Sequence, residues 1–332
     1  MKLLSKRENR MHRPPEVKYG HERLILAVLL FMMLFLSMLS DKFFTIANLT
    51  NTTKNFVEPG FISLGMTFVI LMADIDLSVA GLTALCTIMM AKMHELTGST
   101  ALALVVVFGV GLVGGAINGL LVGYLKIPAF IATMSTMFVY QGLALGVSKG
   151  VTISSFPQSL QFISYGNICG IPNQFVLFVI IAVIFAIVLK FTNYGRYIRT
   201  IGFSSRCATC SGINVPLVKL ETFIISGLMC SLAGLVMIAR VSTAKATLGV
   251  GYDMSAITAV VLGGTSIAGG YGTIKGTVMG LILVGMIKNG FTLARFPSEI
   301  ATITIGALLL MSTVFSTNAE GWKFILKRRE KK

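Results

Sequence analysis

The sequence predicts an all-α, polytopic integral membrane protein with about ten transmembrane helices and both termini in the cytoplasm. The first observation is composition: of 332 residues, 55% are hydrophobic and only 12% are charged, whereas soluble domains average about 25% charged residues. The second is a series of segments without Asp, Glu, Lys or Arg, and the third is the confinement of most of the net charge to three regions.

Ten charge-free segments are candidates for membrane spans. A helix needs about 20 apolar residues to cross about 30 Å of hydrocarbon. The segment 150–189 is too long for one span, and because Ser, Pro, Gln, Asn and Gly fill its first half, we place its helix near 174–189. The ten segments are 24–40, 59–73, 77–91, 96–125, 127–148, 150–189, 222–239, 254–274, 276–287 and 300–319.

Basic side chains concentrate in residues 1–23, 190–221 and 320–332, each with a net charge of +4. Lys and Arg are enriched in cytoplasmic loops, and ten spans would bring all three regions to one side. We therefore expect a basic cytoplasmic segment 1–23, a transmembrane domain 24–319 with a cytoplasmic loop at about 190–220, and a basic cytoplasmic tail 320–332. This charge lies beside the lipid bilayer and not in an aromatic-rich basic patch, so no nucleic-acid partner is expected.

The sequence lacks the motifs of an enzyme or a metalloprotein. It contains no G-x-x-x-x-G-K-[ST] nucleotide-binding motif, and its three histidines assemble no Ser-His-Asp or Cys-His constellation. The Cys-x-x-Cys spacing of "CATC" (207–210) has no His or second pair nearby to complete a zinc site. We therefore expect a transport subunit with no catalytic residue, no metal and no cofactor of its own.

Two aspartates, Asp74 and Asp76, separate the second and third predicted spans. A carboxylate at the bilayer centre costs about 2.5–3.5 kcal/mol on insertion scales, but at a turn between spans most of that cost disappears. One interpretation is a turn in which Asp76 caps a helix that starts at Leu77. The other is a polar group on a transport route or at a gate.

Glycines cluster in two of the predicted spans. Gly111, Gly115, Gly119 and Gly123 follow one another at Gly-x-x-x-Gly spacing, which allows close helix packing in membranes. Six further glycines fall within 263–276. Packing is one explanation for these, and a broken or re-entrant helix is the other, because irregular backbone at membrane depth must be buried in protein or line a cavity.

Five stretches in order resemble the permease subunits of bacterial ATP-binding-cassette importers of the ribose, xylose, arabinose and autoinducer-2 branch. The resemblance starts at "FFTIANLTN" (43–51) and covers most of the chain. The stretches are "LGMTFVILMADIDLSVAGL" (64–82), "INGLLVGYLKIPAFIATMSTMFVYQGLAL" (117–145), "GRYIRTIGFSSRCATCSGINVPLVKL" (195–220), "ISGLMCSLAGLVMIAR" (225–240) and "GYDMSAITAVVLGGTSIAGGYGTIKGT" (251–277).

The resemblance implies an importer subunit in the bacterial cytoplasmic (inner) membrane. A periplasmic binding protein would deliver a monosaccharide or similar small polar solute, and two permease chains, alike or unlike, would form the pathway. Separate ATPase subunits would hold ATP and Mg and drive alternating access. The family's ATPase-docking segment corresponds here to 202–213, and the residues expected to couple to the ATPase are Gly202, Arg206, Ala208, Ser211, Gly212 and Ile213.

Within that docking segment we expect a short helix, because ATPase closure must be transmitted by a rigid element. Ala208, Ser211 and Ile213 would make apolar and hydrogen-bonding contacts, and Arg206 would face an acidic partner. Gly212 would end the helix as its C-terminal glycine. A generic positive-inside loop is the alternative interpretation.

A neutral solute needs hydrogen-bonding groups and aromatic faces along its route. The residues expected on the route or at a gate are Asp76, Ser78, Asn118, Phe130, Thr133, Tyr140 and Gln141. Asn118 and Gln141 could equally pack between helices. The alternative function is an ion-coupled secondary transporter, in which Asp74 and Asp76 would bind a proton or Na⁺.

The chain departs from the family pattern at several positions. Ala73 and Asp74 stand where the family has paired glycines, and Ala80 stands at the following glycine. Ser204 and Ser205 replace an Asn-Glu pair in the docking segment. The Ala, Arg and Leu positions after that pair are Cys207, Thr209 and Cys210. These changes predict a dedicated ATPase partner or an unlike pair of permease chains.

Overall fold

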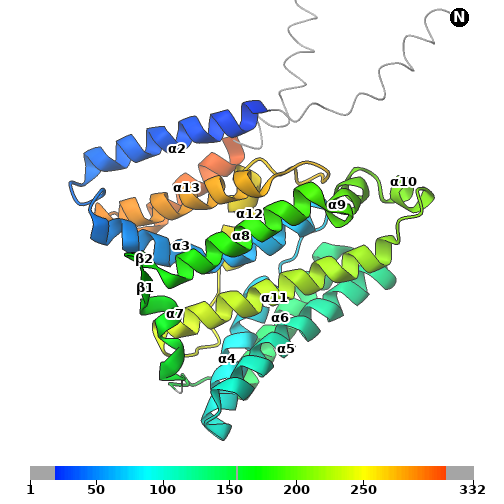
Figure 1. Cartoon of the computed structure of the whole chain (residues 1–332), viewed down its shortest axis with the longest axis horizontal. Helices are drawn as coiled ribbons and strands as arrows, with labels where there is room; N and C mark the ends of the chain where they lie inside the picture. Colours follow the sequence, from blue (N-terminus) through cyan, green and yellow to red (C-terminus); the bar gives the residue numbers. More distant parts are fainter. Residues whose placement is uncertain (1–18, 155, 312–332) are drawn as a thin grey trace, which may run out of the picture.

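The computed structural model describes residues 19–154 and 156–311 (Figure 1). Two-residue strands β1 (Asn167–Ile168) and β2 (Ile171–Pro172) form one antiparallel hairpin, and most of the remaining described residues are helical, which confirms the prediction of a helical chain. The helices are α2 (Tyr19–Leu39), α3 (Ile46–Leu71), α4 (Val79–Thr97), α5 (Thr100–Gly119) with a π-helical turn (Leu120–Tyr124), α6 (Ala129–Ser148), a short 3₁₀ turn (Gln158–Leu160), α7 (Phe162–Tyr165), α8 (Asn173–Phe191), α9 (Asn193–Phe203), α10 (Ser205–Cys210), α11 (Val215–Val241), α12 (Tyr252–Leu262), α13 (Ile274–Leu293) and a last helix over Ser298–Met311.

Side-chain caps fix where several of these helices begin. The Thr45 hydroxyl accepts the backbone N–H of Asn48 at the start of α3, and Thr273 accepts that of Gly276 at the start of α13. Asn214 caps α11 by accepting the N–H of Leu217. Each cap satisfies one of the backbone donors that a helix start leaves free.

Five of the described helices are long and apolar enough to cross a membrane, as expected of a multi-pass membrane protein. They cover Thr100–Tyr124, Ala129–Ser148, Asn173–Phe191, Val215–Val241 and Ile274–Leu293. Shorter apolar helices lie over Ile25–Leu39, Tyr252–Leu262 and Ser298–Met311. The count of ten spans and the side of each terminus stay predictions, and the basic stretches 1–18 and 320–332 lie outside the described residues.

Two predicted span boundaries were wrong. The segment 254–274 is not one span, because α12 ends at Leu262 and helix resumes only at Ile274. The second span does not start at residue 59, because α3 begins at Ile46 and includes Glu58. A charge-free criterion misses residues 46–58 of this helix, because they include Lys54 and Glu58, and Arg240 neutralises Glu58 inside the protein.

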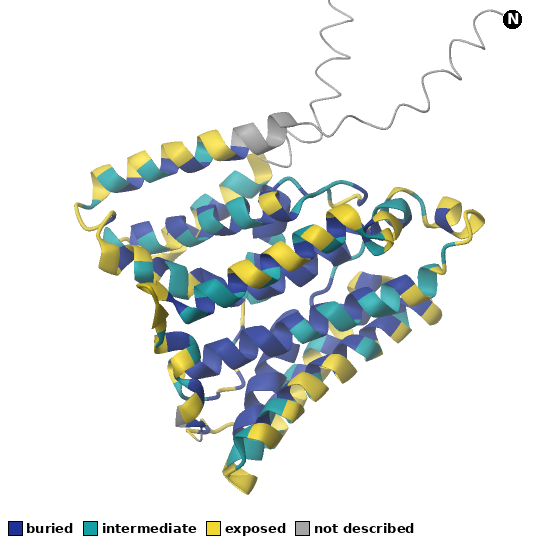
Figure 2. Ribbon diagram, viewed as in Figure 1, coloured by how far each residue is buried: buried dark blue, intermediate teal, exposed yellow. Residues whose placement is uncertain are grey.

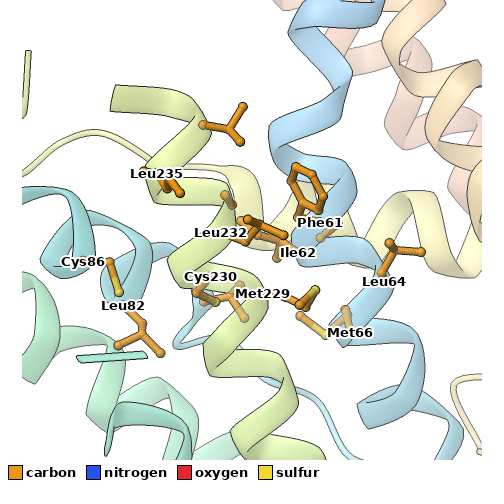
Figure 3. Packing of buried hydrophobic residues seen from close by; sticks show 14 of the residues in the cluster. Phe61, Ile62, Leu64, Met66, Leu82, Cys86, Met229, Cys230, Leu232 and Leu235 are labelled. Atoms are coloured by element: carbon orange, nitrogen blue, oxygen red, sulfur yellow. The ribbon is translucent and has the colours of Figure 1, made fainter. Parts of the chain in front are cut away.

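Helix α11 lies at the centre of the bundle. Figure 1 shows α2, α13, α3 and α8 on one side of it and α4, α5 and α6 on the other. Figure 3 shows the core where α3, α4 and α11 meet, with Phe61 and Met66 of α3, Leu82 of α4 and Met229 of α11 among the buried side chains. In Figure 2 α11 is mostly buried, whereas α2, α5, α6 and α8 carry exposed faces.

Those exposed faces are apolar. Phe31 and Leu34 of α2, Val105 of α5, Phe138 of α6 and Val183 of α8 are all exposed. A soluble protein rarely leaves so much apolar surface uncovered. The faces therefore fit contact with lipid or with another membrane-embedded chain.

The glycine stripe of α5 packs against α11, as its spacing predicts. A Cβ atom added at Gly123 would lie 2.7 Å from the carbonyl oxygen of Pro216, and one at Gly119 would lie 2.7 Å from the Cα of Leu220. Gly111 and Gly115 approach the α11 backbone still more closely, at Gly227 and Phe223. Any larger side chain on this stripe would push the two helices apart.

Candidate functional site: a buried carboxylate and two interrupted helices

The linker between α3 and α4 brings both predicted aspartates into the protein. Ala73 adopts a left-handed backbone with φ of 63°, a conformation that costs a non-glycine residue about 1–2 kcal/mol. Asp74 forms an ion pair with Lys219 of α11, with 2.7 Å between its Oδ2 and the Lys219 Nζ.

Asp76 is 2% exposed and its carboxylate is held by hydroxyl and amide donors. Its Oδ1 accepts the backbone N–H of Ser78 at 3.0 Å and the Ser78 hydroxyl at 2.6 Å. Its Oδ2 accepts the hydroxyl of Ser226, on α11, at 2.8 Å. The predicted cap is displaced, because α4 starts at Val79 and the N–H that Asp76 binds precedes the helix. These donors, and not solvent, offset the cost of burial.

A chain of hydrogen bonds continues from Asp76 into two more helices. The Asn118 amide of α5 donates to the Ser78 hydroxyl at 2.7 Å, and Thr136 of α6 donates to the Asn118 Oδ1 at 2.7 Å. Thr133 donates to the carbonyl oxygen of Ile75 at 3.1 Å. We call these six residues the Asp76 network: Asp76, Ser78, Asn118, Thr133, Thr136 and Ser226.

The second interrupted segment lies between α12 and α13. Gly264, Gly269 and Gly270 have φ of 88°, 85° and 78°, a backbone conformation that residues other than glycine rarely adopt. The glycine-rich stretch is therefore a break between two helices, the second of the interpretations left open above. The break meets the end of α3, because the Gly270 N–H donates to the carbonyl oxygen of Leu71 at 2.8 Å.

Helix α10 forms the centre of the predicted docking segment. The Ser204 hydroxyl caps its start by accepting the N–H of Cys207. At its end Gly212, with φ of 81°, donates to Thr209, and Ile213 donates to Ala208. This pair of bonds is a Schellman motif, which confirms Gly212 as the C-terminal glycine of this helix.

Two of the residues predicted to couple to the ATPase pack against the chain itself. Ala208 is fully buried, so its side chain cannot reach a partner. Gly202 packs against the backbone of Leu71 and Gly270, where an added Cβ would overlap both. Ala208 is therefore an anchor within the chain and not the partner contact expected of it, whereas the coupling role of Gly202 stays a prediction. Arg206, Ser211 and Gly212 are exposed, and Ile213 is half-buried.

Helix α9 attaches the docking segment to both interrupted segments. Besides the Gly202 contact, the Arg199 guanidinium donates to the carbonyl oxygen of Gly272 at 2.9 Å. The rings of Phe203 and Tyr271 meet edge-on with centroids 4.6 Å apart. We call this contact region the joint: Leu71, Ala73, Arg199, Gly202, Phe203, Gly269, Gly270, Tyr271 and Gly272.

The chain matches the model of a known family over residues 48–313, described as the permease component of branched-chain amino acid transport systems. The chain belongs to this permease family. The ribose import permease RbsC of Haemophilus influenzae is 35% identical over 299 residues, 89% of this chain and 92% of the relative. RbsC of Escherichia coli K12 is 34% identical, covering 88% and 92%. The autoinducer 2 import permease LsrD of Photorhabdus luminescens is 31% identical, covering 90% and 91%. No solved structure matches the chain.

The structure of the permease brings only some of the predicted route residues together. Asp76, Ser78, Asn118 and Thr133 belong to one network, as described above. Tyr140 is buried and donates to the carbonyl oxygen of Gly114 at 2.9 Å. Phe130 is 53% exposed, and Gln141 is half-buried. The roles of all seven in transport stay predictions.

Three functional candidates in the permease escaped the sequence reasoning. Ser226 and Thr136 complete the Asp76 network from other helices. Glu58 is fully buried and binds Arg240 through Nε at 2.6 Å and the Tyr252 hydroxyl at 2.8 Å. A signal existed only for Glu58, an acid that directly precedes the charge-free segment 59–73.

Proposed function

We propose that this permease is the membrane-spanning subunit of an ATP-binding-cassette importer in the bacterial cytoplasmic membrane. It translocates a monosaccharide or similar small polar solute that a periplasmic binding protein delivers. It works with a second permease chain, alike or unlike, and separate ATPase subunits hold ATP and Mg. The relatives named as ribose and autoinducer 2 import permeases support this class of solute.

The observation that carries the proposal is the attachment of α10 to the joint. A short helix capped at both ends and anchored by buried Ala208 is rigid, and it presents Arg206, Ser211 and Gly212 on its exposed side. These groups suit an ATPase groove with an acidic rim. Through α9, a push on α10 reaches both interrupted segments at once.

The path from the joint to the Asp76 network is short. Leu71 of the joint ends α3, and Asp76 lies five residues further in the linker that follows. A displaced linker moves a carboxylate that binds α11 and, through Ser78 and Asn118, α5. We propose this network as the element that changes between the two states of the transport cycle.

The ion-coupled alternative now rests on one aspartate. Asp74 is bound by Lys219, whereas Asp76 has no cationic side chain as partner in the part of the chain that the structure describes. A proton or Na⁺ would therefore have to bind at Asp76. This alternative predicts uptake without any ATPase, which the following experiment also measures.

The test uses the native cysteines of the permease. Cys207 and Cys210 are exposed on α10, Cys169 is exposed in the hairpin at the other end of the bundle, and Cys86 and Cys230 are buried (Figure 1). We expect a P-loop ATPase to copurify with the gently solubilised permease. Its presence should slow maleimide labelling of Cys207 and Cys210 about tenfold or more and leave Cys169 unchanged.

Labelling is read per cysteine by peptide mass spectrometry, with and without salt-stripping of the ATPase. Equal labelling of Cys207 and Cys210 in both samples would show that α10 is not the docking segment. Uptake by proteoliposomes that contain the permease alone and an ion gradient would overturn the importer itself.

A further inference from the structure

A polar cavity of about 950 Å³ opens at the end of the bundle opposite α10. It lies where the end of α2, the start of α3 and the end of α13 come together (Figure 1). It takes no part in the Asp76 network or the joint. Its lining is unlike the rest of the apolar surface.

The cavity lining is strongly basic. Four cations line it, Lys42, Lys54, Arg240 and Arg295, against one acid, Asp41. Arg240 is bound to Glu58, and Lys54 lies 5.7 Å from the ring centroid of Tyr165. Lys42 and Arg295 form no ion pair with any residue that the structure describes. Positive charge in this cavity is thus available to a ligand.

Amide groups supplement the cations. Asn48, Asn51 and Asn55 recur along α3 and Asn289 comes from α13. Asn48 and Asn289 bind each other through two reciprocal amide hydrogen bonds of 3.0 Å. Asn51 and Asn55 are exposed and extend into the opening. Cations with additional N–H donors are the chemistry that binds phosphate groups.

The location of the basic residues that line the cavity requires an explanation. If α10 is cytoplasmic, as the proposed function has it, the cavity is on the outer side, where membrane proteins carry few Lys and Arg. The positive-inside bias therefore does not account for four basic residues here. The argument from the lining itself holds for either orientation.

An exposed apolar strip leads away from the cavity along α2. Leu30, Phe31, Leu34 and Met38 are exposed, Met38 by 89% at the rim of the cavity. A water-soluble anion would bind the cations without contacting the apolar strip. A lipid would place its headgroup in the cavity and its acyl chains along the strip.

We propose that this cavity binds the phosphate of an anionic phospholipid headgroup, such as that of phosphatidylglycerol. Lys42, Lys54 and Arg295 bind the charge, and Asn51 and Asn55 donate to the phosphate oxygens. The bound lipid holds the ends of α2, α3 and α13 together.

The test compares two double variants of the full chain in nanodiscs of phosphatidylcholine with a minor fraction of phosphatidylglycerol. Lys42→Gln/Lys54→Gln removes two cavity charges, and Lys126→Gln/Lys245→Gln removes two exposed charges elsewhere. Lipids that stay bound are counted by native mass spectrometry. We expect phosphatidylglycerol enrichment to fall about 30-fold in the cavity variant, from about 1 kcal/mol per basic residue, and to persist in the control.

A second arm distinguishes the source of the phosphate. Soluble glycerol 1-phosphate is titrated into the detergent-solubilised chain, and the unfolding temperature is followed. Saturable stabilisation by this probe without phosphatidylglycerol enrichment would overturn the lipid assignment in favour of a soluble phosphorylated ligand. Loss of enrichment in both variants alike, or enrichment in neither chain, would overturn the site.

Discussion

At the scale of single residues, the decisive feature is a buried carboxylate that has hydrogen-bond donors but no cationic partner among the residues that the structure describes. Asp76 receives three donors, two of them hydroxyls that can also accept. Such a group tolerates exchange for an amide far better than removal. The same residue tests the ion-coupled alternative, because an amide cannot carry the charge that a coupling ion requires.

For Asp76→Asn we expect folding and ATP-dependent uptake to be retained, with a loss of about 1 kcal/mol of stability. For Asp76→Ala we expect a loss of about 2–4 kcal/mol, because the Ser78 and Ser226 donors lose their acceptor. Unfolding temperatures of the purified chain measure both. An asparagine variant that folds normally but imports nothing would instead make the charge itself essential.

The double variant Asp76→Ala/Ser226→Ala serves as the control for this interpretation. If the two residues act through their hydrogen bond, the losses of the single variants will not add. Additive losses would mean that Ser226 and Asp76 contribute independently.

At the scale of elements, helix α10 depends on its C-terminal turn. Gly212 has φ of 81° and its N–H binds Thr209, and proline can provide neither the angle nor the donor. Gly98 ends α4 in the same way, with φ of 65° and its N–H bound to His94, on an exposed turn. The two glycines form a matched pair in which one belongs to the docking segment.

We expect Gly212→Pro to abolish uptake while membrane insertion and solute delivery continue, because the docking helix loses its fixed end. Gly98→Pro should cost similar local stability, because proline again fits neither the φ nor the bonded N–H, and should leave uptake within about twofold of normal, because this turn lies outside the docking segment. Uptake in proteoliposomes of the complete importer measures both. Normal uptake by the Gly212→Pro variant would contradict the proposed coupling role of α10.

Helical periodicity and charge predict the elements better than they predict their junctions. The Gly-x-x-x-Gly stripe of α5 and the terminal glycine of α10 were readable because each depends on local spacing. The close packing of Gly202 was not, because it depends on how α9 folds against segments about 130 and 70 residues away. The Asp76 network could be predicted only in part for the same reason, since Ser226 is 150 residues from the aspartate that it binds.

At the scale of the whole molecule, the joint connects one surface helix to both breaks in the bundle. Alanine in a helix is normally favoured over glycine by about 1 kcal/mol. At Gly202 its Cβ would overlap the backbone of Leu71 and Gly270, whereas at Gly109 of α5 it would meet nothing within 4 Å.

We expect Gly202→Ala in the assembled importer to keep ATP hydrolysis and to reduce uptake about tenfold or more, because α9 no longer seats on both breaks. Arg199→Gln, which removes the guanidinium bond to Gly272 and leaves the Gly202 packing intact, should give a smaller loss of the same kind. Gly109→Ala should change neither rate. Equal loss of hydrolysis and uptake in Gly202→Ala would mean that the joint supports assembly and not coupling.

The cluster of Arg240 and Tyr252 around the fully buried Glu58 restricts how the helices can separate. Glu58, Arg240 and Tyr252 belong to α3, α11 and α12, and stripping a buried charge of its partner costs about 3–5 kcal/mol. Separating these helices at this point would leave Glu58 buried without its partner and is therefore costly. We therefore expect the middle of α3, the end of α11 and the start of α12 to move together, and the opening that admits solute to form elsewhere in the bundle.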